Sequence, residues 1–312
     1  MFDIVIIGAG PAGLSASVYA KRAGLDAVTY EQFPLSGGQV QKTYDVDNYL
    51  GLPGISGPEL CEKFRDHANK LGCKIEENTV SSVSKCEEGF KVVTENGEVI
   101  TKTVIFAMGA DHAALGVPGE EDLAGMGVSY CATCDGAFFK GRSVAVVGGG
   151  DVAVEDALFL ARGCSKVYLI HRRDSLRAAG ILRDKLLATE NIEVLWDTVV
   201  TKINGEDSVE SLDIENVKTK EKSVLLVNGI FVAVGINPVN DLIKKMASDS
   251  GETLVEINEK GYVVSDEMGA TKTPGLFVAG DLRAKKLRQI VTAVADGANA
   301  VTAAEAFINE MK

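Results

Sequence analysis

The stretch Ile4-Val5-Ile6-Ile7-Gly8-Ala9-Gly10-Pro11-Ala12-Gly13 decides the fold of this 312-residue chain. A short apolar run, a turn rich in glycine and a helical pattern over residues 14–23 predict a strand, a tight turn and a helix. Gly8 permits the turn, Gly10 lets a pyrophosphate approach the backbone, and Gly13 lets the helix pack closely on the strand. The phosphates of a dinucleotide then lie at the helix N-terminus.

The same order of elements occurs again after residue 142. An apolar run over residues 143–147 precedes Gly148-Gly149-Gly150-Asp151-Val152-Ala153, and a helical pattern continues to about Arg162. The two copies lie too far apart to share one βαβ unit, so each predicts its own nucleotide site. The expected fold class is therefore α/β, with two Rossmann-like, three-layer dinucleotide-binding domains.

Strand-like runs lie between and after the two motifs. Those at residues 90–94, 194–196 and 224–227 are rich in Val, Leu and Thr and are separated by Gly, Asn and Asp. They predict a small antiparallel element in each domain. The helical pattern over residues 290–311 has no strand after it, so this helix should pack back on the first domain.

The second domain is therefore expected to be inserted in the first. We place the first domain, for FAD, at residues 1–113 and 243–312, and the second, for NADPH, at residues 114–242. The two crossings fall near residues 115–119 and 235–238, which are rich in turn-forming residues that make hinges.

The residues after the second strand of each copy distinguish the two nucleotides. Glu31 follows the apolar run 27–30, where a carboxylate can accept hydrogen bonds from both ribose hydroxyls of an adenosine. In the second copy, the run 166–170 ends in His171-Arg172-Arg173, and Arg177 follows. Guanidinium groups hold a 2′-phosphate through charge-assisted hydrogen bonds, each worth about 1.5–3 kcal/mol.

The second site is therefore expected to bind NADPH rather than NADH, with His171 shaping the phosphate pocket. Its turn is formed by Gly148, Gly150, Asp151 and Ala153. A disulfide does not accept a hydride efficiently by itself, whereas a flavin does and then passes electrons on in pairs. We therefore expect FAD at the first site.

Cys131-Ala132-Thr133-Cys134 is the distinctive cysteine pair. Two intervening residues let one thiolate attack and the other resolve a mixed disulfide. Structural zinc would need a second ligand pair, and the chain has 3 histidines and no second CxxC motif. We expect no metal. The other cysteines are expected to be small buried hydrophobic residues; they are Cys61, Cys73, Cys86 and Cys164.

The residues after the pair add three expectations. Cys134 is expected to be the sulfur nearer the flavin. Asp135 is expected to donate or accept a proton during thiol exchange, although an Asp before Gly136 is also a turn signal. Phe138 and Phe139 fit either an apolar docking surface for a partner protein or the core.

Composition excludes other classes of partner. The formal net charge of −12 argues against a nucleic acid or an anionic membrane surface. The sequence has no basic segment followed by an apolar one at Met1, and no run of 18 apolar residues. We expect a cytoplasmic protein with no membrane partner.

With these motifs in place, the chain resembles the low-molecular-weight thioredoxin reductases of the bacterial type over essentially its whole length. Besides the two glycine motifs and residues 171–177, the resemblance rests on Gly37-Gly38-Gln39, Asp47-Asn48-Tyr49, residues 128–136, residues 273–281 and Arg288-Gln289-Ile290-Val291-Thr292-Ala293. It implies electron transfer from NADPH through FAD to the Cys131–Cys134 disulfide, and then to thioredoxin or a thioredoxin-like protein. It also implies a homodimer.

The resemblance further implies residue roles at the flavin. Asp281 would bond the ribityl and phosphate portion of FAD, and Gln39 and Asn48 would lie near the flavin. The helix opening at Gln289 would point its N-terminus at the pyrimidine edge. The remaining FAD positions that the resemblance implies are Pro11, Ala12, Gly38, Gly109, Gly280, Arg288 and Ile290.

Four positions depart from the pattern of that family. Leu50 stands where a proline is frequent. Met108 stands where a threonine is common, and Val152 stands where a serine or threonine is common. Because both lie beside the nucleotide motifs, we expect altered cofactor affinity rather than lost binding. Ala137 stands where an aromatic residue is frequent in the patch that grips thioredoxin. The alternatives are a flavin enzyme that uses reduced ferredoxin, a reductase that serves a peroxidase or a small dithiol, and a non-enzymatic redox sensor.

Overall fold

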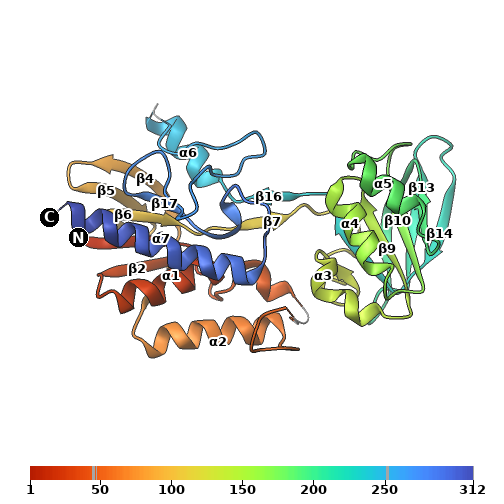
Figure 1. The fold of residues 1–312 in the computed structure, drawn as a ribbon, viewed down its shortest axis with the longest axis horizontal. Coiled ribbons are helices and arrows are strands. Elements are labelled where there is room, and N and C mark those ends of the chain that lie inside the picture. The colour runs from red at the N-terminus through yellow and green to blue at the C-terminus, as the bar shows by residue number, and fades with distance from the viewer. Residues whose placement is uncertain (44–45, 47, 251–252, 312) are drawn as a thin grey trace. The chain divides into compact units, whose positions relative to one another are not determined.

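The computed structural model describes residues 1–43, 46, 48–250 and 253–311. The chain divides into two compact units (Figure 1). Unit 1 comprises Met1–Gln41, Gly57–Asp111 and Asn237–Lys312, and unit 2 comprises Lys42–Ser56 and His112–Ile236. No helix of the described residues has the length and apolar character needed to cross a membrane.

Unit 1 is built on a seven-stranded mixed sheet. Parallel strands occupy the order β3-β2-β1-β6, with β17 also parallel to β6, and β5 and β4 continue antiparallel from the other half of β6. The strands are β1 (Phe2–Ile7), β2 (Ala27–Glu31), β3 (Lys74–Glu77), β4 (Val80–Cys86), β5 (Gly89–Thr94), β6 (Gly97–Phe106) and β17 (Leu276–Val278). The helices are α1 (Pro11–Arg22), α2 (Gly57–Lys70), α6 (Asp241–Ser250) and α7 (Ile290–Glu310), with 3-10 turns η1 (Gly38–Lys42) and η3 (Gly280–Leu282).

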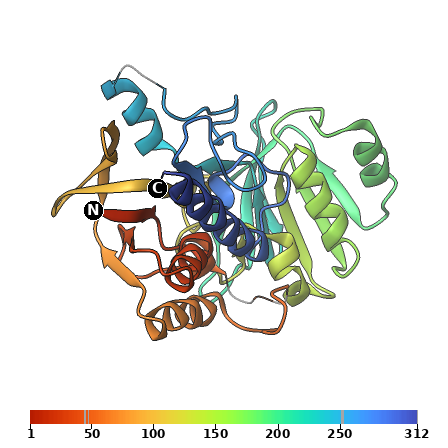
Figure 2. The same cartoon turned by 60° about the vertical axis from the view of Figure 1, so that its left-hand side comes forward.

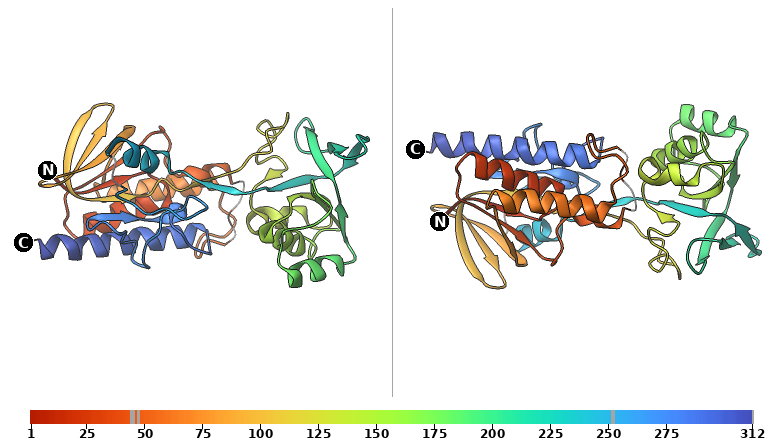
Figure 3. Two further views of the ribbon diagram at one scale, coloured as in Figure 1. Left: turned by 90° about the horizontal axis from the view of Figure 1, so that it is seen from above. Right: turned by 90° about the horizontal axis from the view of Figure 1, so that it is seen from below.

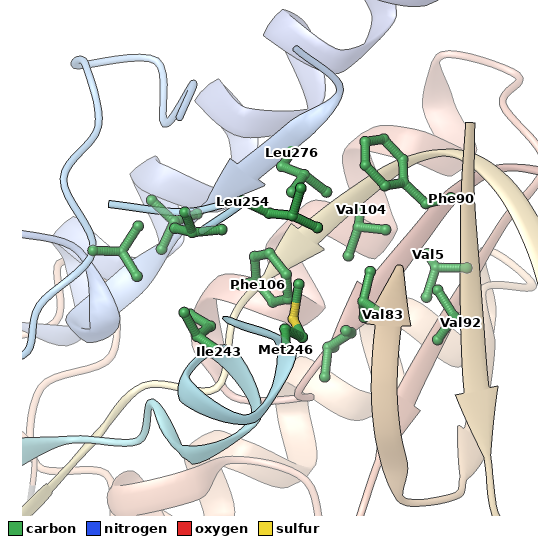
Figure 4. Close-up of a cluster of buried hydrophobic side chains, with 14 of the residues drawn as sticks. Val5, Val83, Phe90, Val92, Val104, Phe106, Ile243, Met246, Leu254 and Leu276 are labelled. Carbon is green, nitrogen blue, oxygen red and sulfur yellow. The ribbon is translucent and has the colours of Figure 1, made fainter. Parts of the chain in front are cut away.

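Alternate residues of the same strands face the two sides of this sheet. Val5 and Phe106 belong to a cluster covered by α6 and the β4–β5 hairpin; Figure 4 shows Phe106 near Met246 and Val5 near Val92. Ile4 and Ile105 belong to a second cluster, covered by α1 and α7. Figures 2 and 3 show α7 lying along α1. The period of two along each strand thus gives three layers.

Unit 2 repeats the plan with a five-stranded parallel sheet, in the order β11-β10-β9-β15-β8. A separate antiparallel sheet, β12-β13-β14, packs on its second face. The strands are β8 (Val128–Ser129), β9 (Ser143–Gly148), β10 (Lys166–Ile170), β11 (Ile192–Leu195), β12 (Thr198–Asn204), β13 (Ser211–Asn216), β14 (Lys222–Leu226) and β15 (Gly229–Ala233). The helices are α3 (Ala132–Asp135), α4 (Asp151–Leu160) and α5 (Gly180–Leu187), with a 3-10 turn η2 (Gly136–Phe139).

The two Rossmann-like units confirm the predicted fold class, and one predicted strand is assigned differently. Residues 90–94 pair antiparallel with both of their neighbouring strands, and residues 224–226 lie in the antiparallel sheet of unit 2, as expected. Residues 194–195 instead lie in β11, an edge of the parallel sheet that pairs with β10. The expectation failed because α5 returns the chain alongside β10, and a short apolar strand does not reveal its direction.

Apart from the segment Lys42–Ser56, the chain enters and leaves unit 2 through two strands that pair with each other, β7 (Ala110–His112) and β16 (Ile236–Pro238). The Ala113 N–H donates to Gly235 O at 3.0 Å, and the Val239 N–H donates to Gly109 O at 3.1 Å. The second predicted crossing, residues 235–238, coincides with β16. The first, residues 115–119, lies beyond β7 and inside unit 2.

Candidate active site

The first glycine turn is fixed by close backbone contacts in unit 1. Gly8 has φ of 103°, and a Cβ there would lie 2.6 Å from the carbonyl oxygen of Ala107. A Cβ at Gly13 would collide with the carbonyl oxygen of Gly8. Gly10 caps α1, and Pro11 at the first helical position loses no hydrogen bond because that N–H has no partner in the helix. The turn therefore has the shape that the sequence predicted.

Glu31 is held against this turn by two backbone donors. Its Oε2 accepts a hydrogen bond from the Ala9 N–H at 2.6 Å, and its Oε1 accepts one from the Phe33 N–H at 3.1 Å. An ionised carboxylate has about four acceptor positions, so two remain for ribose hydroxyls. The same carboxylate also fastens β2 to the glycine turn, a role that was not predicted from the sequence.

Two glycines bring a second loop to the same place. The Gly37 N–H donates to Ala9 O at 2.9 Å, next to the glycine turn. Gly38 has φ of 58°, and a Cβ there would meet no atom within 4 Å, so this backbone faces open space. Gln39 follows in η1. Asn48 is exposed and belongs to the segment grouped with unit 2, and Asp47 lies outside the described residues.

Asp281, in η3, supplies a buried acceptor close to the start of α1. Its Oδ1 is buried and accepts no hydrogen bond from the described residues, although the Lys285 ammonium lies 3.5 Å away. Burial raises the pKa of Asp281, and the nearby Lys285 and Arg288 oppose that shift. The preceding Gly280 packs so closely that a Cβ there would lie 2.9 Å from the Cβ of Ala12. A buried acceptor without a donor suits a ligand that carries hydroxyl groups.

An ion network that was not predicted from the sequence holds η3 on α7. Asp296 accepts hydrogen bonds from the Gly280 N–H at 3.1 Å, from Arg283 at 3.0 Å and from Lys285 at 2.8 Å. The guanidinium group of Arg283 and the ammonium group of Lys285 together balance the charge of this buried carboxylate. An acidic residue inside the small-residue helix Ile290–Glu310 was the only available signal.

Gln289 and Thr292 cap the N-terminus of α7. Gln289 is the N-cap and forms a reciprocal capping box with Thr292. Arg288 lies over the ring of Tyr262, 3.9 Å from its centroid, and Ile290 begins the helix.

The ring of His171 packs against the second glycine turn, in unit 2. The His171 side chain is only 6% exposed, and a Cβ at Gly149 would collide with its ring. The ring nitrogen Nε2 lies 3.0 Å from Ser175 O. His171 therefore shapes the turn by packing. The Arg177 N–H donates to Gly149 O at 2.7 Å, which ties the arginine segment to the same turn.

The other residues of this turn are also placed. Asp151 begins α4, and its Oδ1 accepts a hydrogen bond from the Ala179 N–H at 2.8 Å. Gly148 is required because a Cβ there would lie 2.5 Å from both Ala153 Cβ and Ala233 O. Gly150 has open space around it. Val152 is 58% exposed, so its side chain leaves the turn intact.

Three exposed arginines stand beside that turn without acidic partners. Among the described residues, Arg172, Arg173 and Arg177 form no salt bridge. The acid next to them, Asp174, pairs with Lys218 at 3.0 Å, which lowers the pKa of Asp174. Lys218 thus neutralises the nearest negative charge and leaves the guanidinium groups for an anion.

Cys131 and Cys134 form a disulfide across α3. The Cys131 N–H donates to Ser129 Oγ at 3.1 Å, and the Ser129 hydroxyl donates to Asp135 Oδ2 at 2.5 Å. Ser129 therefore fixes both ends of the disulfide loop, a role that the sequence reasoning did not assign.

The remaining cysteines depart partly from expectation. Cys61 and Cys164 are buried, and burial raises the pKa of Cys61 to about 12. Cys73 and Cys86 are only half-buried, because they lie beside or in short strands at the margin of the unit 1 sheet. None of the four is disulfide-bonded.

The two phenylalanines after the disulfide have different environments. Phe139 is 8% exposed and packs edge-on against Phe231, so it belongs to the core. Phe138 is 38% exposed. The docking prediction now concerns Phe138 alone.

Comparison with known proteins places these sites in a family. Residues 2–297 match the family described as pyridine nucleotide-disulphide oxidoreductase. The chain belongs to this family. Among pyridine nucleotide-disulphide oxidoreductases, it is 41% identical to the thioredoxin reductase of Bacillus subtilis over 100% of this chain and 96% of the relative. It is 42% identical to that of Listeria innocua, over 100% and 95%.

Solved structures of this family agree. The thioredoxin reductase of Streptococcus pyogenes is 41% identical, covers 99% of both chains and has a TM-score of 0.91. Membership implies an oxidoreductase with nicotinamide and flavin cofactors. It also suits the disulfide of unit 2 and the glycine turns of both units.

Proposed function

We propose that the chain is a thioredoxin reductase that holds FAD in unit 1 and NADPH in unit 2. One observation carries the proposal: unit 2 contains both the Cys131–Cys134 disulfide and, at the end of β10, three arginines that form no salt bridge with any described residue. The first provides a redox centre for a protein disulfide, and the second provides recognition of a 2′-phosphate. The relatives named above are thioredoxin reductases.

The residues of unit 1 fit FAD. Gly38 leaves open backbone beside the glycine turn, Glu31 keeps acceptor capacity for a ribose, and Asp281 Oδ1 accepts no hydrogen bond from the described residues. The unit 1 groups that would hold FAD are Gly8, Gly10, Pro11, Ala12, Gly13, Glu31, Gly38, Gln39, Gly109, Gly280, Asp281, Arg288, Gln289 and Ile290. Asn48, the remaining position that the resemblance implies, lies in the segment grouped with unit 2. When bound, the flavin accepts a hydride from the nicotinamide and supplies the electron pair that reduces the disulfide.

The residues of unit 2 perform the remaining steps. The turn from Gly148 to Ala153 would hold the NADPH pyrophosphate, and Arg172, Arg173 and Arg177 would hold its 2′-phosphate. In the reduced protein, the Cys131 thiolate attacks the thioredoxin disulfide, which forms a mixed disulfide and releases one thioredoxin thiolate. Cys134 then attacks Cys131 Sγ. This reforms the internal disulfide and releases the second thioredoxin thiol.

Asp135 would move the protons of these steps. Its Oδ2 accepts a hydrogen bond from the Ser129 hydroxyl, so the carboxylate is held within the disulfide loop. A homodimer and a cytoplasmic location belong to the same proposal, and size-exclusion chromatography tests the first. A ferredoxin-dependent reductase is not favoured, because the arginine cluster has no role in it.

Anaerobic titration of the purified flavoprotein with NADPH, followed by oxidised thioredoxin, tests the proposal. We expect NADPH to bleach the flavin absorbance and thioredoxin to restore it. Failure of NADPH to bleach the flavin would exclude the NADPH-dependent function. If a small disulfide restored the absorbance but oxidised thioredoxin did not, the acceptor would be the small molecule rather than thioredoxin.

Replacing Asp135 by Asn is expected to slow thioredoxin reduction by about 10²-fold or more, the usual contribution of a positioned acid or base. Flavin bleaching by NADPH should keep its rate, because it does not use this carboxylate. Stopped-flow absorbance separates the two steps. Asp213→Asn, on β13 of unit 2, is the matched control. Equal loss in both steps would remove Asp135 from the mechanism.

A further inference from the structure

Glu120 is a buried carboxylate that the proposed reaction does not use. It is 2% exposed and accepts three hydrogen bonds, from the Leu115 N–H at 2.9 Å, the Gly116 N–H at 2.7 Å and the Tyr130 hydroxyl at 3.0 Å. An unsatisfied buried charge costs several kcal/mol, so these donors must stay in place. Glu120 therefore joins two segments that are separate in the sequence.

Tyr130 connects this carboxylate to the segment through which the chain enters unit 2. Its ring stacks on His112, the last residue of β7, with centroids 5.1 Å apart and planes at 18°. Burial and the hydrogen bond to Glu120 raise the pKa of Tyr130, so its hydroxyl keeps the proton that it donates. The next residue is Cys131.

The segment held by Glu120 is also fixed to the antiparallel sheet of unit 2. The Ile203 N–H, on β12, donates to Pro118 O at 3.0 Å. A Cβ at Gly119 would collide with the carbonyl oxygen of Ile203. Although residues 115–119 have the composition of a hinge, their backbone is locked within unit 2.

We propose that Glu120, Tyr130 and His112 form a strut that fixes the Cys131–Cys134 disulfide to the segment entering unit 2. The meaning of this strut for turnover rests on the proposed function. Glu120 and Tyr130 are positioning residues, because they touch neither the sulfur atoms nor a substrate. The strut makes residues 112–120 and 129–135 one rigid body. The disulfide is then carried by the entering segment and does not move with a loop of its own.

Hydrogen exchange measured by mass spectrometry on the oxidised protein tests the strut without any substrate. Tyr130→Phe keeps the ring and removes one hydrogen bond to Glu120. We expect exchange of the Leu115 and Gly116 amides to rise about tenfold, the effect of losing one charge-assisted bond. His112→Ala should raise exchange in residues 129–135, since coupling between two segments is reciprocal.

Tyr168→Phe, on β10 of the same unit, is the matched control and should leave both segments unchanged. Unchanged exchange at Leu115 and Gly116 in Tyr130→Phe would overturn the strut. So would faster exchange at 115–116 while His112→Ala leaves residues 129–135 unaffected, because the two segments would then move independently.

Turnover gives a second readout. Tyr130→Phe should lower kcat for thioredoxin about 3- to 10-fold at unchanged KM, while NADPH-dependent ferricyanide reduction stays constant. Equal loss of both activities, or unchanged kcat, would contradict a positioning role. If the unsubstituted protein reduced ferricyanide but no thioredoxin, the proposed function would fail, and the exchange experiment would still decide the strut.

Discussion

Replacing Cys134 by Ser is expected to lower the turnover of thioredoxin reduction by at least about 10³-fold, the scale of loss seen when a reacting nucleophile is removed. Cys131 and Cys134 form the disulfide of unit 2, and no other cysteine of the chain is paired. A remaining Cys131 thiol can attack a partner disulfide but cannot be resolved from it. The variant should therefore accumulate a mixed disulfide with thioredoxin, which non-reducing electrophoresis detects.

Two further variants make that result specific. NADPH-dependent reduction of ferricyanide should survive in Cys134→Ser, because it needs the nucleotide sites and not the disulfide. Cys86→Ser replaces a half-buried, unpaired cysteine on β4 and should keep full turnover. Retention of more than about a tenth of the thioredoxin activity in Cys134→Ser would show that electrons leave by another route.

The parts of the fold that the sequence predicted are those that depend on neighbouring residues. The two glycine turns were predictable because Gly8 and Gly13, and likewise Gly148, are required by contacts within one strand, turn and helix. The end of β10 was also predictable from neighbouring residues, because charged residues directly follow an apolar run. The disulfide needed only the spacing of Cys131 and Cys134.

The parts that the sequence did not predict depend on contacts between distant residues. Asp296 and Glu120 look like ordinary surface acids in the sequence, yet each satisfies three donors inside its unit. Residues 115–119 have the composition of a hinge, but Glu120 and Ile203 lock their backbone. Composition gives the freedom of an isolated segment, whereas tertiary hydrogen bonds decide how much of it remains.

Replacing both Arg172 and Arg173 by alanine is expected to reduce kcat/KM for NADPH by about 10²- to 10⁴-fold, because two charge-assisted hydrogen bonds contribute about 3–6 kcal/mol together. Both guanidinium groups are exposed and form no salt bridge among the described residues, so they are free to bind a 2′-phosphate. NADH lacks that phosphate, so its kcat/KM should change by less than about threefold.

Steady-state kinetics with both nucleotides measures this change in preference directly. Arg142→Ala, before β9, removes an exposed arginine from the opposite end of the same sheet and should leave both values unchanged. Lys218→Met tests the same phosphate recognition with a smaller expected loss of affinity. It leaves Asp174 unpaired beside the arginines, so NADPH alone should bind more weakly, by a factor of about 2 to 5 for an exposed ion pair. An equal loss for NADPH and NADH in the double variant would mean that the arginines stabilise the turn rather than recognise the phosphate.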